Sequence, residues 1–182
     1  MKGTKLLLFL CTCCISLFVP LIYKSYSLLE ILCISFFSLV LVTGATIDMQ
    51  YFILPDEGSI GLAIIGYLYT VITHHVYIDT CIQVLVVAII SICLRYISHN
   101  GFGWGDVKWF CAISIWFTPV QMIVMIYISV LTACLYLAFM KTINRPIERY
   151  IPFGPFLAFG AWQGLHFSMF WEDIYWLIIT SI

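Results

Sequence analysis

Seven runs of apolar residues, separated by short polar stretches, occupy most of this 182-residue chain. A helix needs about 20 mostly apolar residues to cross a bilayer, so runs of this kind restrict the chain to a membrane-embedded fold. Hydrophobic residues make up 63% of the chain, whereas soluble domains average roughly 45–50%. The ten-residue alternating strands of a membrane barrel are missing. The sequence therefore predicts an all-α, polytopic transmembrane bundle with spans at 5–23, 28–47, 59–73, 79–97, 106–118, 120–140 and 152–169.

We expect three segments in this bundle. Residues 1–27 hold an N-terminal transmembrane span, because no small-residue cleavage site follows the first apolar run. Residues 28–169 form the main membrane domain. Residues 170–182 are too short to cross again, and their aromatic residues predict a tail at the membrane interface.

The distribution of basic residues predicts the orientation of the bundle. A break at Thr118-Pro119 separates the fifth and sixth runs, because proline disfavours helix in the residue before it. With the N-terminus in the cytoplasm, seven of the eight basic residues then fall inside, as the positive-inside rule requires. The inner residues are Lys2, Lys5, Arg95, Lys108, Lys141, Arg145 and Arg149, and only Lys24 lies outside. The net charge of −1 gives no basic surface for nucleic acid.

All eight cysteines lie in or beside apolar runs, at positions 11, 13, 14, 33, 81, 93, 111 and 134. We interpret them as packed thiols, because the paired loop spacings of a zinc site are absent. The sequence thus predicts neither a metal site nor a cofactor.

Two aspartates lie at the predicted inner membrane surface, Asp48 after the second run and Asp106 at the start of the fifth. A carboxylate at membrane depth is costly, so it is a functional hypothesis by default. Two facing aspartates share a proton, and one can act as base on a water while the other polarises a carbonyl. The alternative interpretation is that both aspartates are helix N-caps.

The residues around Asp106 allow two interpretations as well. The glycines of GFGWG are consistent with a flexible loop, or they permit positive φ and the close approach of a substrate backbone. Lys108 follows Asp106 by about 200° around a helix, so we expect it to point away toward lipid headgroups.

Three motifs together resemble the type IV prepilin peptidase family. The first is GxGDxK, with Gly103, Gly105, Asp106 and Lys108. The second is an aspartate followed by Pro-Asp, with Asp48, Pro55 and Asp56. The third is IPFGPFLAFGA at 151–161, which contains Pro152, Phe153, Gly154 and Pro155.

The resemblance implies that Asp48 and Asp106 are the catalytic pair and that the other motif residues position the substrate or line the site. It implies a multi-pass protein of the bacterial inner membrane, surrounded by lipid, with its active site facing the cytoplasm. The implied substrate is a type IV prepilin or pseudopilin, cut between its short basic leader and its hydrophobic helix. The oligomeric state is not predicted.

The chain departs from longer family members, which carry a cytoplasmic insert with two CxxC pairs that is associated with methylation. No loop here is large enough for that insert, so we expect a peptidase without methyltransferase activity. Two alternatives remain at this point: a presenilin-like intramembrane protease, which shares the GxGD signature, and a proton-linked transporter or assembly subunit.

Overall fold

The computed structural model describes residues 27–73, 77–98, 102–143 and 151–167, together with Leu177 and Thr180. These parts of the chain form six α-helices and no strand, which confirms the all-α prediction. The helices are α2 (Leu28–Tyr51), α3 (Asp56–Ile72), α4 (Tyr77–Ile97), α5 (Trp104–Ser114), α6 (Pro119–Thr142) and α7 (Gly154–His166).

Six of the seven predicted spans coincide with helices, but the helices differ in length. Three of them, α2, α4 and α6, are long and apolar enough to cross a membrane. The helices α5 and α7 have 11 and 13 residues, fewer than the roughly 20 needed to span the hydrocarbon core. The predicted first span at 5–23 lies outside the described residues, as does nearly all of the predicted tail at 170–182.

Local sequence signals set the starts of the long helices. Ser27 and Glu30 form a reciprocal capping box at the start of α2. Thr118 and Gln121 form another at the start of α6, where Pro119 occupies the first helical position. Such pairs satisfy backbone N–H groups that have no partner within the helix. Because α5 ends at Ser114 and α6 begins at Pro119, the predicted break at Thr118-Pro119 is confirmed.

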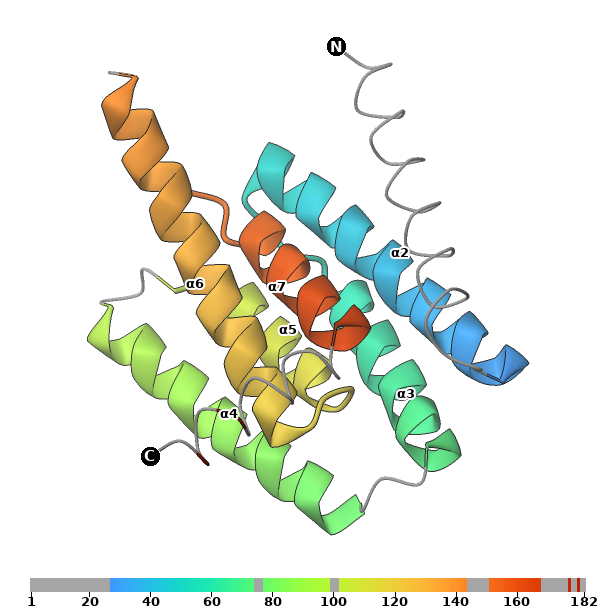
Figure 1. Ribbon diagram of the computed structural model, residues 1–182. Coiled ribbons are helices and arrows are strands. Elements are labelled where there is room, and N and C mark those ends of the chain that lie inside the picture. Colours follow the sequence, from blue (N-terminus) through green and yellow to red (C-terminus); the bar gives the residue numbers. More distant parts are fainter. Residues whose placement is uncertain are drawn as a thin grey trace, which may run out of the picture.

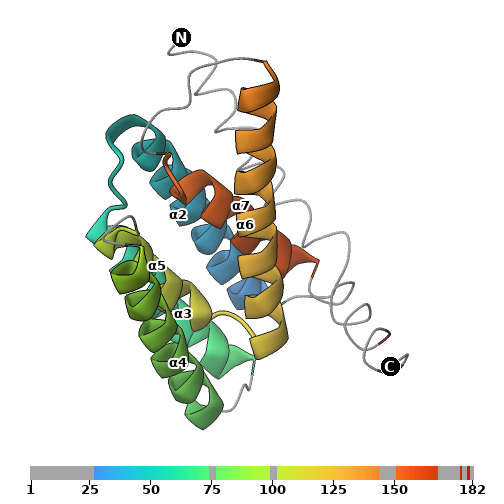
Figure 2. The ribbon, with the colours of Figure 1, turned by 90° about the vertical axis from the view of Figure 1, so that its left-hand side faces the viewer.

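The helices form two groups, α3, α4 and α5 in one and α2, α6 and α7 in the other (Figures 1 and 2). The closely packed neighbours run in the order α4, α5, α3, α2, α7, α6. The first and last helices of this order, α4 and α6, are not among the closely packed pairs. The six helices therefore do not form a closed ring. The C-terminal ends of α2, α4 and α6 lie toward the same end of the bundle.

Trp109 holds α5 in the centre of this arrangement. Its side chain is 1% exposed, and its indole N–H donates to the carbonyl of Pro55 at 3.1 Å. A Cβ on Gly44 or Gly58 would lie 2.1 or 2.7 Å from the Trp109 ring, so the indole fills notches that only glycine leaves open. The contacts of the Trp109 side chain with α2 and α3 thus position α5, which carries Asp106 one turn earlier.

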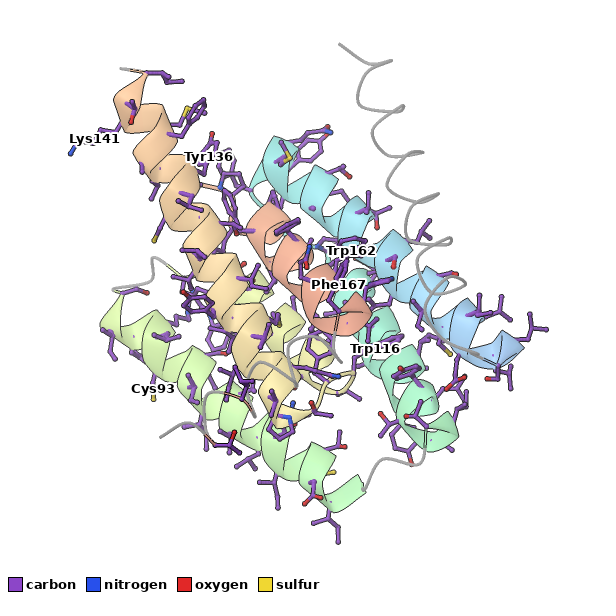
Figure 3. The ribbon with its side chains drawn as sticks, viewed as in Figure 1. Cys93, Trp116, Tyr136, Lys141, Trp162 and Phe167 are labelled. Atoms are coloured by element: carbon purple, nitrogen blue, oxygen red, sulfur yellow. The ribbon has the colours of Figure 1, made fainter. Side chains whose placement is uncertain are left out.

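The described cysteines are free thiols, but they are not all packed as predicted. Cys33 is buried and Cys111 half-buried, whereas Cys81, Cys93 and Cys134 are exposed. Cys93 lies on the outer side of α4 (Figure 3). The prediction of packed thiols is thus wrong for three positions, because an apolar run in a membrane helix contains lipid-facing as well as core positions. The cysteines at 11, 13 and 14 lie outside the described residues.

Candidate active site

Asp48 lies one turn before the end of α2 and is 6% exposed. The helix ends there because Phe52 adopts the left-handed conformation, with φ of 56°, and donates its N–H to the carbonyl of Asp48. The Asp48 Oδ2 atom accepts a hydrogen bond of 2.7 Å from the N–H of Gly154, the first residue of α7. Asp48 therefore joins the C-terminal end of one helix to the N-terminal end of another. Its carboxylate caps the N-terminal end of α7 and not α2, the helix to which Asp48 belongs.

Asp106 occupies the first turn of α5, the position at which a negative charge is stabilised by the helix dipole. Its Oδ2 atom accepts a hydrogen bond of 3.1 Å from the N–H of Gly103, the residue that precedes the helix. The alternative that Asp106 serves its own helix terminus thus has a structural basis. This contact involves one carboxyl oxygen, so it leaves the other available for chemistry.

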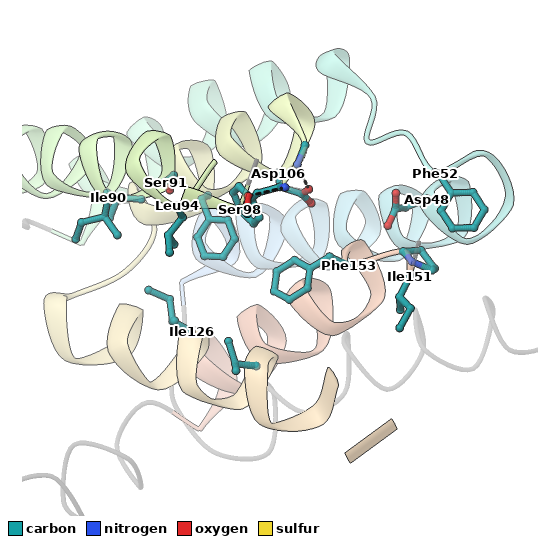
Figure 4. A pocket seen from close by; sticks show the side chains of 16 residues that line it. Asp48, Phe52, Ile90, Ser91, Leu94, Ser98, Asp106, Ile126, Ile151 and Phe153 are labelled. Carbon is teal, nitrogen blue, oxygen red and sulfur yellow. Dashed lines mark hydrogen bonds between the residues drawn. The ribbon is translucent and has the colours of Figure 1, made fainter. Parts of the chain in front are cut away.

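Both carboxyls line one pocket of about 570 Å³ (Figure 4). Two residues that are 58 positions apart in the sequence therefore border the same pocket. In the described part of the chain, Oδ1 of either carboxyl accepts no hydrogen bond. Among the described residues, each aspartate thus has one oxygen held by a backbone N–H and one that accepts no hydrogen bond.

The pocket continues away from the aspartates along an apolar wall. The side chains of this wall come from the two helices that do not pack closely on each other, α4 and α6. They are Val87, Ile90 and Leu94 on α4 and Ile126 and Val130 on α6. Sequence analysis did not identify them, because an apolar residue that faces a pocket and one that faces lipid look alike in the sequence.

The segment at 151–161 supplies another side of the pocket. Pro152 and Phe153 line it, and Gly154 binds Asp48. A Cβ on Gly154 would lie 2.7 to 3.0 Å from three atoms of the Asp48 side chain, so this position requires glycine. Pro155 lies in the first turn of α7, where proline is tolerated, and does not line the pocket.

The glycines of the GFGWG stretch have roles different from those expected. Among the described glycines none has a positive φ, and Gly103 has φ of −72°, so the predicted use of positive φ is wrong for Gly103 and Gly105. A Cβ on Gly105 would lie 3.1 Å from the Cβ of Leu54. Gly105 thus allows close packing within the protein. Gly103 lines the pocket, whereas Gly101 lies outside the described residues.

Lys108 and Asp56 connect two of the motifs. The Lys108 ammonium lies 2.6 Å from Asp56 Oδ2, and the two side chains are 48% and 58% exposed. Lys108 therefore pairs with an acid of the neighbouring loop, which differs from the headgroup contact expected for it. Asp56 is the first residue of α3 and directly follows the N-cap residue Pro55.

We expect this ion pair to contribute little to stability. Asp56→Asn and Lys108→Met should each change the free energy of unfolding by less than about 1 kcal/mol, because exposed pairs are screened by solvent. Denaturant unfolding of the purified protein in detergent measures this change. A loss of several kcal/mol in both variants would show that the pair is shielded from solvent.

Chemically, the pocket can support acid–base catalysis on a water molecule. Two carboxyls that border one pocket and share one proton would provide it with a base and an acid. The free Oδ1 atoms are the places at which that base and acid can act.

Comparisons with known proteins identify similar sequences. A family model described as the type IV leader peptidase family matches residues 34–138, a range that contains both aspartates. A prepilin leader peptidase/N-methyltransferase of Legionella pneumophila is 31% identical over 151 residues, which cover 76% of this chain and 50% of that protein. The chain thus spans about half the length of this curated relative. No solved structure gives a significant match.

Proposed function

The chain belongs to the type IV leader peptidase family, an aspartic protease family, and from this premise we propose that it removes the short leader from type IV prepilins or pseudopilins. Asp48 and Asp106 are the proposed catalytic pair. The observation that supports this best is that both line one pocket and that, within the part of the chain that the structure describes, one oxygen of each accepts no hydrogen bond. Methyl transfer is not part of the proposal.

In the proposed reaction the two aspartates share one proton. The ionised carboxylate takes a proton from a water molecule as the water oxygen attacks the carbonyl carbon of the scissile peptide. The protonated carboxyl donates a hydrogen bond to the carbonyl oxygen and stabilises the developing negative charge. When the intermediate collapses, the peptide C–N bond breaks, and the leaving nitrogen takes the proton that the base removed from water. The Gly154 N–H holds Oδ2 of Asp48 and the Gly103 N–H holds Oδ2 of Asp106, and we assign the reaction to the two Oδ1 atoms.

We further propose seven membrane-embedded helical segments in the bacterial inner membrane, of which α5 and α7 are too short to cross it alone, with the N-terminus and the active site on the cytoplasmic side. The distribution of charged residues supports this orientation. Arg95 and Lys141 lie in the last turns of α4 and α6, and Lys108 lies near the start of α5, at the end of the bundle that holds the two aspartates. Positive charges concentrate on the cytoplasmic side of membrane proteins.

The apolar helix of the substrate is proposed to lie in the bilayer against the bundle, beside the opening between α4 and α6. The apolar wall of the pocket reaches from the aspartates to these two helices. A substrate whose cleavage site is followed directly by a hydrophobic helix matches a pocket that has carboxyls at one end and apolar side chains beyond them.

Leader removal from a candidate prepilin tests the proposed function directly. The full chain is produced together with the prepilin in cells that lack their own leader peptidase, and the pilin is followed on a gel. We expect conversion of the prepilin to a shorter product whose new N-terminus lies just before the hydrophobic helix. If several prepilins with different leaders all stay intact while the protein is present in the membrane, the proposed function is wrong.

A second expectation concerns the apolar wall. Ile126→Trp should raise the KM for a full-length prepilin about 10-fold, because overpacking a formed cavity costs roughly 1–3 kcal/mol. Ile123→Trp is the matched control, since Ile123 lies on the same helix, is 59% exposed and does not line the pocket. Steady-state kinetics of the two purified variants provide the comparison. Equal KM values would place the substrate helix elsewhere on the bundle.

A further inference from the structure

The C-terminal end of α4 holds the peptide backbone of Phe102, which lies just before the GxGD motif. The guanidinium of Arg95 donates through Nη1 to the Phe102 carbonyl. The Phe102 N–H in turn donates to Ser98 Oγ at 3.1 Å, and Ser98 Oγ donates to the carbonyl of Arg95 at 3.1 Å. Both polar backbone groups of Phe102 are thus bound by side chains one turn apart on a single helix.

The charged guanidinium of Arg95 lies against residues 102–104. Its guanidinium carbon lies 4.8 Å from the ring centroid of Trp104, within the range of a cation–π interaction. The side chain is half-buried, and it forms no ion pair with any acid of the described segments. A planar guanidinium can donate to a carbonyl and stack on an indole at once, which an ammonium cannot do in the same way. The contacts of Arg95 therefore bracket Gly103 on both sides, at Phe102 and at Trp104.

The position of Gly103 bears directly on Asp106, because the Gly103 N–H binds Asp106 Oδ2. Phe102 also forms part of the pocket, where its ring lies 5.7 Å from Phe110 and 6.2 Å from Phe153 between ring centroids. A shift of Phe102 would move both a wall of the pocket and the donor that orients the carboxyl. Neither Arg95 nor Ser98 belongs to any of the three motifs.

We propose that Arg95 and Ser98 are positioning residues for Asp106, acting through the backbone of residues 102–104, an inference that rests on the proposed function. Arg95 makes no contact with the reacting atoms. It fixes the loop so that the Gly103 N–H holds one carboxyl oxygen and leaves the other directed into the pocket. The competing explanation is that Arg95 serves only as a positive charge at the inner membrane surface.

Arg95→Met separates these roles, because methionine keeps an unbranched apolar stem and removes the charge and the donors. We expect kcat for prepilin cleavage to fall about 10-fold with KM within about 2-fold, since a small displacement of a reacting group affects the chemical step more than binding. Arg95→Lys restores a charged donor without the planar stack and should lie within about 3-fold of the wild-type kcat. Ser98→Ala removes the acceptor of the Phe102 N–H, and it should likewise lower kcat by about 3-fold.

Lys141→Met is the matched control for charge. Lys141 lies in the last turn of α6, near the upper end of that helix in Figure 3, and its loss removes one positive charge without touching the loop. We expect unchanged kinetics for this variant. The inference is overturned if Arg95→Met keeps the wild-type kcat, or if Lys141→Met lowers kcat as much as Arg95→Met does.

The double variant Arg95→Met/Ser98→Ala adds a test of the shared target. Residues that act on one peptide unit should couple, so the combined loss in kcat should be smaller than the product of the two single losses. Independent, multiplicative losses would contradict a common action on Phe102. If Arg95→Met does not fold, the kcat values of Ser98→Ala and Arg95→Lys test the positioning role in its place. A wild-type protein that leaves every prepilin intact would instead refute the proposed function, which is a separate result.

Discussion

Asp48→Asn and Asp106→Asn should each lower the rate of prepilin cleavage by about 10²–10⁴-fold, the range over which positioned acids and bases contribute to catalysis. Asparagine has nearly the same volume as aspartate and keeps a carbonyl oxygen that can accept the N–H of Gly154 or Gly103. It cannot take a proton from water or donate a carboxylic proton. The variants should therefore fold, insert into the membrane and lose the reaction.

The measurement is single-turnover cleavage of a purified prepilin, together with the amount of each variant in the membrane. Asp79→Asn is the matched control, because Asp79 is an exposed acid in the first turn of α4, at the opposite end of that helix from Arg95. It should cleave at the wild-type rate. The double variant Asp48→Asn/Asp106→Asn should be about as slow as either single variant, because the two residues act as one unit. A wild-type rate in either single variant would contradict the proposed pair.

The helices could be predicted closely because their signals are local. The apolar runs place six helices to within a few residues of their observed ends, and the Thr118-Pro119 pair marks the break between α5 and α6. The location of Asp48 and Asp106 at one pocket could also be anticipated, since alternating helices bring every second loop to the same end of a bundle. Neither inference requires knowing which helix packs against which.

The details of the site depend on packing, and here sequence analysis fell short. Gly154 donates to Asp48 across 106 positions of the chain, a contact that exists only because α2 packs on α7. Gly105 was expected to give a substrate room, but it is the side chain of Leu54 that lies against it. Lys108 was expected at headgroups and instead reaches Asp56, because α3 and α5 are neighbours. Each of these results needs the pairing of helices, which no local pattern in one chain specifies.

The same dependence on packing makes Gly154→Ala the most informative change outside the aspartates. We expect it to lower kcat for prepilin cleavage about 100-fold, the loss associated with a displacement of about 1 Å at a reacting group. The new methyl group would lie 2.7 Å from Asp48 Oδ2, 2.9 Å from its Cβ and 3.0 Å from its Cγ. The N–H that binds the carboxyl remains, so the change tests the position of Asp48 and leaves its chemistry intact.

The variant Gly61→Ala is the control for adding a methyl group to a helix of this bundle. Its Cβ would meet the ring edge of Phe36 at 3.2 Å, a contact that a small movement of the ring relieves. Alanine is favoured over glycine in a helix by roughly 1 kcal/mol, so Gly61→Ala should keep the wild-type stability and kcat. Kinetics and thermal unfolding of both variants in detergent separate a displaced carboxyl from a disrupted bundle. If Gly154→Ala cleaves as fast as Gly61→Ala, the contact between α7 and Asp48 does not position the carboxyl, and the proposed role of the IPFGPF segment is lost.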